Sequence, residues 1–388
     1  MRKDKTRFES RCLPGVPLPG TSLSGVSLSG VSLFFAVMLF AAAAAALFFP
    51  AAVSAQEADE VAVNNNGIIT VGYVMIGAES DWRLACNKSV EEAFTRANGY
   101  SLLISDAQQK QDKQIKAVRE FVNQEVDYIL LNPIVESGWD ASLEEAREAG
   151  IPVIAFDREV DVKDENAYTA WLGSDFYLEG EKACAWLEAF LETNASEQMK
   201  KEGIGLAHIQ GTLNSSAQLG RTKALDDTLE KHPEIKLLDR QSGDFTTAKG
   251  KEVMVDMLAR FGDEIDIVYC ENDNEAYGAI EAIREAGLVP GSDIAAGEIL
   301  ILSFDATHNG LAMTMDGQIA LNTECAPLYG PLLTQMIQTL ERGEELPERQ
   351  YVHEEQFSAL KEPASVNVRG EEFPVIEVTQ EVIDGRTY

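Results

Sequence analysis

The sequence predicts an α/β protein with two similar lobes, each built around a parallel β-sheet. From Ile68 onward, short apolar runs rich in Val and Ile alternate with helical patterns. Such alternation builds a parallel sheet that is covered by helices on both faces. The same rhythm repeats in a second half of the chain, and 388 residues are enough for two domains. Because clefts between domains favour small-ligand sites, we expect a site between the lobes.

The apolar periods place the elements in order along the chain. Strands are predicted at 68–76, 101–105, 127–131 and 151–156, with helices at 82–97, 111–124 and 139–149. In the second half, helices near 175–193, 215–231, 247–260 and 274–287 alternate with strands at 204–209, 235–238, 265–269 and 299–303. A helix at 307–315, a strand at 318–322 and a helix at 327–341 follow. The tail to Tyr388 is less regular, and we expect it to wrap one lobe.

The first 55 residues differ from the rest of the chain. A basic beginning and a Ser/Gly-rich spacer precede the apolar run from Leu33 to Val53, and the small residues Ser54 and Ala55 follow this run. This pattern predicts a signal peptide at 1–55, a polar tether at 56–67 and a periplasmic or otherwise extracytoplasmic protein. The apolar run could nearly span a bilayer, so an uncleaved N-terminal anchor is the alternative.

Composition excludes several classes of partner. The chain has 64 Asp and Glu against 32 Lys and Arg, a formal charge of −32, which repels nucleic acid and anionic lipid. The body contains Cys86, Cys184, Cys270 and Cys325, without a C-x-x-C pair or a Cys/His cluster. We therefore expect no metal, and buried free thiols, with one or two disulfides as the alternative.

A polar and aromatic cluster follows the first predicted strand. The stretch ITVGYVMIGAESDWR at 69–83 runs from a buried strand into Glu79, Ser80, Trp82 and Arg83. Ligands of open α/β sheets bind beyond the carboxyl ends of strands, so this cluster is a candidate pocket wall. A sugar suits it, because hydroxyl groups need paired donors and acceptors while the C–H face packs on an aromatic ring. The alternative is a capped helix with Trp82 in the core.

Polar residues also follow most of the other predicted strands. They are Asn132, Asp157 with Arg158, Gln210, Asn272 with Asp273, Asp305, and Asn322 with Glu324, while Arg221 lies in the helix after Gln210. If the two sheets face each other, these groups converge on one cleft and give charge-assisted hydrogen bonds to hydroxyl groups. Alternatively, Asp157 and Arg158 form a local ion pair, and Asn272 caps a helix.

Little in the sequence supports catalysis. The four histidines lie beside no evident nucleophile, and the mature chain lacks the G-x-S-x-G, P-loop and G-x-G-x-x-G patterns. We predict no catalytic residue and no cofactor. A glycosidase that uses the Glu79 and Asp157 carboxyl groups is the enzymatic alternative.

The ordered motifs resemble one family of transport proteins. They are VGYVMIGAESDWR (71–83), DAQQKQDKQIKAVR (106–119), NPIVESGW (132–139), IPVIAFDREVDVKD (151–164), QSGDFTTAKGKEVM (241–254), NDNEAYGAIEAIREAG (272–287) and ECAPLYGP (324–331). Together they resemble type I periplasmic sugar-binding proteins of ABC importers, the ribose- and galactose-binding family, and its galactofuranose-binding branch in particular.

The resemblance implies two Rossmann-like lobes joined by three crossovers near Ser174, Asp305 and Asn322. The first lobe would contain 68–173 and 306–322, and the second 174–305 and 323–388. The implied ligand shell comprises Ile76, Gly77, Ala78, Glu79, Ser80, Asp157, Arg158, Arg221, Asn272 and Asp305, with Trp82, Arg83 and Glu324 as further members. The chain departs from the family pattern at Ala78, which could remove a hydroxyl contact.

The implied function is non-catalytic capture of a monosaccharide, a galactofuranose-like furanose or a related aldose such as ribose, arabinose or galactose. A monomer would then deliver the sugar to an ABC transporter permease. A receptor of the same fold that partners a chemoreceptor or histidine kinase is the alternative. A sugar-responsive repressor would need an N-terminal helix-turn-helix, where this chain has an apolar leader.

Overall fold

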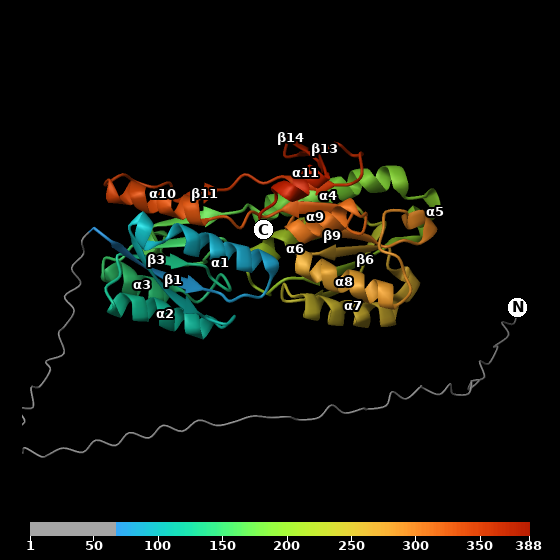
Figure 1. The fold of residues 1–388 in the computed structure, drawn as a ribbon. Coiled ribbons are helices and arrows are strands. Elements are labelled where there is room, and N and C mark those ends of the chain that lie inside the picture. The colour runs from blue at the N-terminus through green and yellow to red at the C-terminus, as the bar shows by residue number, and fades with distance from the viewer. Residues whose placement is uncertain (1–66) are drawn as a thin grey trace, which may run out of the picture. The chain divides into compact units, whose positions relative to one another are not determined.

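The structure, a computed structural model, describes residues 67–388 and contains two α/β lobes (Figure 1). Each lobe has a mostly parallel sheet with helices on both faces, which confirms the predicted fold class. The predicted signal peptide at 1–55, and all of the tether at 56–67 except its last residue, lie outside the described residues. Among residues 67–388, no helix has the length and hydrophobicity needed to cross a bilayer.

The first lobe contains a six-stranded parallel sheet in the order β11-β5-β4-β3-β1-β2. Its strands are β1 (Ile69–Met75), β2 (Tyr100–Asp106), β3 (Tyr128–Leu131), β4 (Val153–Phe156), β5 (Ala170–Gly173) and β11 (Arg349–Tyr351). Its helices are α1 (Asp81–Ala93), α2 (Gln111–Asn123), α3 (Asp140–Glu148) and α10 (Gly330–Glu341). Side chains alternate along a strand, so Val71 and Tyr73 pack under α1 and α10, whereas Val74 packs under α2 and α3.

The second lobe contains a seven-stranded sheet in the order β15-β12-β10-β9-β8-β6-β7. Its strands are β6 (Ile204–Gln210), β7 (Ile235–Ser242), β8 (Ile267–Cys270), β9 (Leu300–Asp305), β10 (Leu321–Glu324), β12 (Gln356–Ser358) and β15 (Ile376–Glu377). Its helices are α4 (Phe176–Asn194), α5 (Glu197–Glu202), α6 (Ser216–Lys231), α7 (Thr247–Phe261), α8 (Asp273–Glu285) and α9 (His308–Met315). Apolar residues of α4 and α6 cover one face of the central strands, and those of α7 and α8 cover the other.

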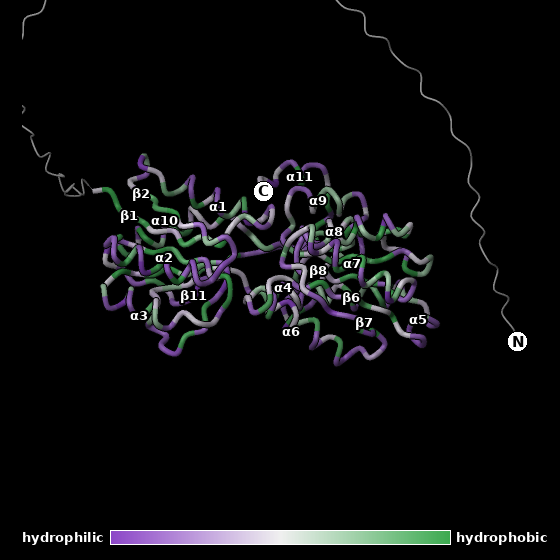
Figure 2. The backbone as a smooth tube through the Cα atoms, turned by 90° about the horizontal axis from the view of Figure 1, so that it is seen from below, coloured by the Kyte–Doolittle hydropathy of each residue, from purple (hydrophilic) through white to green (hydrophobic). Residues whose placement is uncertain are grey.

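The hydropathy of the chain follows this layering. In Figure 2, the β1 segment is strongly hydrophobic, while hydrophilic stretches lie at the outside of both lobes. Strands β3, β4 and β8 are buried along their whole length, as expected for strands covered on both faces. The four cysteines of the described residues are buried free thiols, as expected from the sequence.

The lobe boundaries differ from the prediction in the last third of the chain. Residues 306–322, expected in the first lobe, contain α9 and lead into β10, and β10 pairs in parallel with β9 of the second sheet. Conversely, α10 packs on α1 and β11 pairs with β5, so residues 330–351 belong to the first lobe. The chain therefore crosses between lobes near Ser174, as predicted, and then near Cys325 and Glu354 instead of Asp305 and Asn322.

The tail is more ordered than the sequence suggests. Strand β11 joins the first sheet, whereas β12 and β15 join the second, so the tail contributes to both lobes instead of wrapping one. A hairpin of β13 (Ser365–Val368) and β14 (Glu371–Pro374) and the helix α11 (Gln380–Gly385) complete it. Two- to four-residue strands carry too little periodicity to be recognised, which explains why they were not predicted.

A buried carboxylate joins three elements of the second lobe. Asp273, the first residue of α8, accepts hydrogen bonds from Ser303 Oγ (2.7 Å), Thr307 N and Oγ1 (2.8 Å each) and Asn322 Nδ2 (2.7 Å). Ser303 lies on β9, Thr307 caps α9 and Asn322 lies on β10. Asp273 is therefore a structural residue, although its position after a strand placed it among the candidates for the cleft.

We expect Asp273→Ala to destabilise the fold strongly. The substitution leaves several buried donors without an acceptor, and each such group costs about 1–3 kcal/mol. The free energy of unfolding, measured by urea denaturation, should fall by about 3 kcal/mol or more. The exposed Asp263→Ala is the control and should change it by less than about 0.5 kcal/mol. Equal stability of the two variants would contradict a joining role for Asp273.

Candidate ligand-binding site

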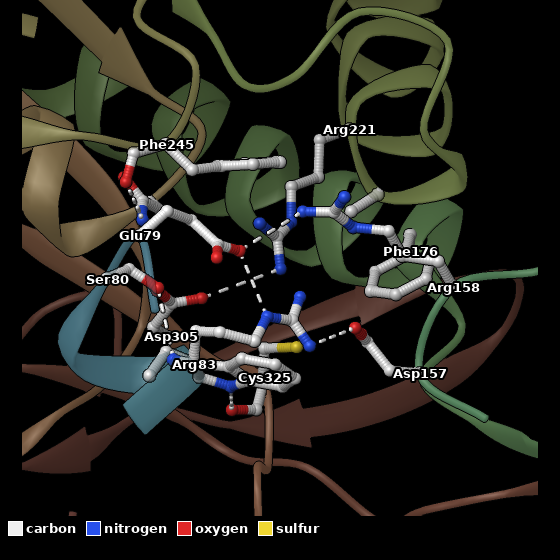
Figure 3. A pocket seen from close by; sticks show the side chains of 13 residues that line it. Glu79, Ser80, Arg83, Asp157, Arg158, Phe176, Arg221, Phe245, Asp305 and Cys325 are labelled. Atoms are coloured by element: carbon white, nitrogen blue, oxygen red, sulfur yellow. Dashed lines mark hydrogen bonds and ion pairs between the residues drawn. The ribbon is translucent and has the colours of Figure 1, made fainter. Parts of the chain in front are cut away.

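A small pocket lies where the strand ends of the two lobes meet. Its lining atoms surround about 300 Å³ of space, part of which is open to solvent, and the lining residues are Glu79, Ser80, Trp82, Arg83, Asp157, Arg158, Phe176, Ala217, Arg221, Phe245, Asn272, Asp305 and Cys325. Hydrogen bonds that join the lobes include those from Asp81 N to Asn274 Oδ1 (3.1 Å), from Glu136 N to Asn214 O (3.1 Å) and from Glu159 N to Ser216 Oγ (2.8 Å). The lobes are thus closed on each other, and Figure 3 shows charged side chains of both pointing into the pocket.

Arg83 is fixed by the start of α1 and by two carboxyl groups. Ser80 caps the helix by accepting a hydrogen bond from Arg83 N (3.1 Å). The guanidinium donates from Nε to Glu79 Oε1 (3.0 Å) and from Nη1 to Asp157 Oδ2 (2.8 Å). Burial opposes ionisation of Glu79, but Arg83 and Arg158 lower the pKa of its carboxyl group below the usual value. Glu79 is therefore an anion at neutral pH.

Arg158 is held more loosely than Arg83. Its Nη1 donates to the carbonyl oxygen of Ile134 (2.9 Å), and its Nη2 lies 3.8 Å from Glu79 Oε1. The guanidinium lies over the ring of Phe245, 5.2 Å from the ring centre. Burial and the neighbouring Arg83 lower the pKa of Arg158 to about 10, so it is still charged at neutral pH. Its remaining N–H groups can donate to a ligand.

Arg221 approaches from α6 on the opposite side of the pocket. Glu179 Oε2 accepts a hydrogen bond from its Nε (2.8 Å) and lies 2.8 Å from its Nη2, and Nη1 donates to the carbonyl oxygen of Glu271. Asp305 lies 3.9 Å from Nη2. Burial raises the pKa of Asp305 well above its usual value even though Arg221 opposes this shift.

The backbone is strained at three of the pocket residues. Asp157, Phe245 and Asp305 have positive φ angles of 61°, 60° and 99°. Non-glycine residues in such conformations cost on the order of 1–3 kcal/mol each and concentrate at functional sites. Asp157 follows β4, Asp305 ends β9 and Phe245 follows β7, so the strain turns side chains at strand ends into the cleft.

The lining suits a neutral ligand with many hydroxyl groups. Three guanidinium groups face the three carboxyl groups of Glu79, Asp157 and Asp305, so no charge of one sign dominates. Glu79 Oε2 is buried and has no hydrogen-bond partner in the protein, which leaves one acceptor for a ligand. The rings of Phe176 and Phe245 offer faces on which a C–H surface can pack.

The structure brings together nine of the thirteen predicted site residues: Glu79, Ser80, Trp82, Arg83, Asp157, Arg158, Arg221, Asn272 and Asp305. Several of them also have structural contacts that the sequence suggested as alternatives. Ser80 and Asn272 cap α1 and α8, and the Trp82 indole donates to the carbonyl oxygen of Cys325 (2.6 Å).

Four predicted residues do not line the pocket. Ile76 packs against Ala107 and Ile134, the Gly77 carbonyl oxygen accepts from Asn87 Nδ2 (2.7 Å), and Ala78 is exposed. Glu324 pairs with Arg386 and accepts from Tyr388 Oη (2.7 Å). Successive side chains of a strand point to opposite sides, so Cys325 lines the pocket in place of Glu324.

Four residues that line the pocket were not predicted from the sequence: Phe176, Ala217, Phe245 and Cys325. Phe245 follows β7 in the stretch SGDF. Its position beyond the carboxyl end of a strand is a signal that could have identified it. Phe176 and Ala217 begin helices whose facing surface only the tertiary structure reveals.

Comparison with known proteins agrees with this architecture. Residues 71–345 match the periplasmic binding protein domain. The chain is 39% identical over 266 residues to the galactofuranose-binding protein YtfQ of Escherichia coli, covering 68% of this chain and 79% of that protein. A Mycobacterium smegmatis structure in complex with β-D-fucofuranose has a TM-score of 0.69 and 37% identity, covering 76% of this chain and 94% of that one. The Shewanella arabinose transporter component bound to α- and β-L-arabinofuranose has a TM-score of 0.67 and 35% identity, covering 74% and 91%.

We expect Arg83→Met to destabilise the fold, because it leaves Glu79 and Asp157 buried without their cation. Breaking a buried ion pair in this way costs about 3–5 kcal/mol. Arg119→Met is a matched control, since Arg119 pairs with Glu145 on the surface and such pairs contribute about 0–1 kcal/mol. Urea unfolding measures both. Equal losses in the two variants would show that Arg83 does not neutralise the pocket.

Proposed function

The chain belongs to the periplasmic binding protein domain family, and on this premise we propose that it captures a monosaccharide in its furanose form and delivers it to an ABC transporter permease. It is a sugar-binding protein of the ABC transporter type and not an enzyme. We further propose that it acts outside the cytoplasm, after export directed by residues 1–55.

The observation that carries this proposal is the unpartnered oxygen of Glu79 in a closed, charge-balanced pocket. A buried acceptor without a donor costs free energy, and a ligand hydroxyl group removes that cost. Anionic ligands fit poorly, because the three guanidinium groups already have carboxyl partners. A neutral sugar can bond to the charged groups and leave their balance unchanged.

The furanose ring is favoured by the ligands of the similar proteins. The E. coli relative is described as galactofuranose-binding, and two structures above 30% identity contain fucofuranose or arabinofuranose. We assign sugar contacts to Glu79, Arg158, Arg221 and Asp305 by hydrogen bonds and to Phe176 and Phe245 by packing. Ser80, Arg83, Asp157 and Asn272 would hold the wall in place.

A thermal-shift screen of the purified protein tests the function. D-galactose, D-fucose, L-arabinose and D-ribose are the probes, with sucrose as the control that is too large for the pocket. A sugar at 100 times its Kd should add about 2.7 kcal/mol of stability. With a binding sugar labelled by ¹³C at C1, NMR of the complex should show a furanose anomeric carbon. Absence of any shift, or conversion of the sugar to a product, would contradict sugar capture.

We expect Arg158→Ala to abolish most of the sugar-dependent shift while the fold is retained. Arg158 has longer contacts with carboxyl groups than Arg83, so its guanidinium remains available to the ligand. Losing one or two charge-assisted hydrogen bonds, at about 1.5–3 kcal/mol each, should raise the Kd at least tenfold. Titration calorimetry measures the Kd, and Arg119→Ala serves as the control. Unfolding of Arg158→Ala would instead indicate a structural ion pair.

A further inference from the structure

The three segments that cross between the lobes meet at a buried cluster behind the pocket. Ser174 follows β5, Cys325 follows β10, and Glu354 lies between β11 and β12. Ser174 Oγ donates to Glu354 Oε1 (2.5 Å) and lies 3.5 Å from Cys325 Sγ. The backbone N–H of Ala326 donates to the same Glu354 oxygen (2.8 Å). Glu354 therefore joins all three crossing segments.

A second carboxyl group connects this cluster to the pocket. Glu179 of α4 is 1% exposed, and its Oε2 accepts the hydrogen bond from Arg221 Nε and forms the ion pair with its Nη2. Its other oxygen, Oε1, is buried without a protein donor. One oxygen of Glu179, one of Glu354 and the sulfur of Cys325 lie within 4.8 Å of one another. The two carboxyl groups therefore lie next to each other.

The charges around the pair leave room for one proton. Arg221 forms the ion pair with Glu179, whereas Lys182, the other cation beside the pair, donates its Nζ to the Glu354 carbonyl oxygen (3.2 Å) and not to the carboxyl group. The Cys325 thiol and the Tyr329 hydroxyl, the other titratable groups that face the pair, are neutral because burial raises both pKa values. Burial and the adjacent Glu179 likewise raise the pKa of Glu354 well above its usual value.

We propose that Glu354 carries one proton that it shares with Glu179, and that this carboxyl pair is the positioning unit that fixes Arg221 in the pocket from the crossing segments. Because Glu354 Oε1 accepts from Ser174 and Ala326, the proton belongs on Oε2, from which it donates to the unpartnered oxygen of Glu179. Glu179 then remains an anion that orients Arg221. The inference rests on the proposed sugar capture and extends it to residues outside the pocket.

Two isosteric substitutions test where the proton lies. Glu354→Gln keeps an acceptor for Ser174 and a donor for Glu179, so it mimics the protonated group, whereas Glu179→Gln removes the anion that holds Arg221. We expect the Kd of D-galactose or L-arabinose, measured by calorimetry at pH 7, to stay within about threefold in Glu354→Gln and to rise more than tenfold in Glu179→Gln. The exposed Glu355→Gln is the control, with the same substitution at the neighbouring position. The reverse pattern would overturn the proposal.

The pH dependence of stability provides a second readout that does not need a sugar. A carboxyl group whose pKa is raised by folding contributes stability that is present at low pH and is lost as pH rises through the raised pKa. The melting temperature of Glu354→Gln, relative to that of the natural chain, should therefore increase as pH rises from 5 to 9. The melting temperature of Glu355→Gln relative to that of the natural chain should stay constant over the same range. Parallel profiles of melting temperature against pH for Glu354→Gln and the natural chain would contradict the proposal of a shared proton. If the natural chain binds no sugar, the proposed function is refuted. The dependence of melting temperature on pH would still test whether Glu354 and Glu179 share a proton.

Discussion

The need to neutralise buried charge governs the centre of this protein. Arg83, Arg158 and Arg221 are almost completely removed from water, as are Glu79, Asp157 and Asp305. An isolated buried charge costs several kcal/mol, so each of these groups depends on a neighbour of opposite charge. Arg83 and Arg158 pair with Glu79 and Asp157 in the first lobe, and Arg221 pairs with Glu179 and Asp305 in the second, so each lobe balances its own buried charges.

The buried charged groups of the two lobes line the two walls of the cleft. The carboxyl ends of the strands bring polar groups to the cleft, and strained backbone at Asp157, Phe245 and Asp305 turns them inward. Residues that line the pocket also cap helices, as Ser80 and Asn272 do. The pocket is consequently rigid in its parts, while the crossing segments near Ser174, Cys325 and Glu354 are where its two walls connect.

Charged groups arranged in this way recognise neutral hydroxyl groups selectively. A ligand that lacks one hydroxyl group leaves a buried ionised group without a partner, which costs more than a missing neutral contact. The acidic surface, with twice as many Asp and Glu as Lys and Arg, contributes to solubility and does not determine this selectivity. Selectivity depends on the few side chains that are shielded from solvent.

The sequence alone determined the α/β class, the two-lobed organisation and most of the pocket lining. Hydrophobic periodicity and the presence of polar residues directly after a strand can both be read from short stretches of sequence. The sequence indicated Asp157, Arg158, Asn272 and Asp305, which line the pocket in the structure, for this reason. Only the tertiary structure decided that α10 returns to the first lobe, that Cys325 faces the pocket while Glu324 faces away, and that Glu179 meets Glu354. These outcomes depend on strand pairing and side-chain direction between segments far apart in the chain, such as those of Ser89 and Gly330, which are 241 residues apart, and no local pattern encodes them.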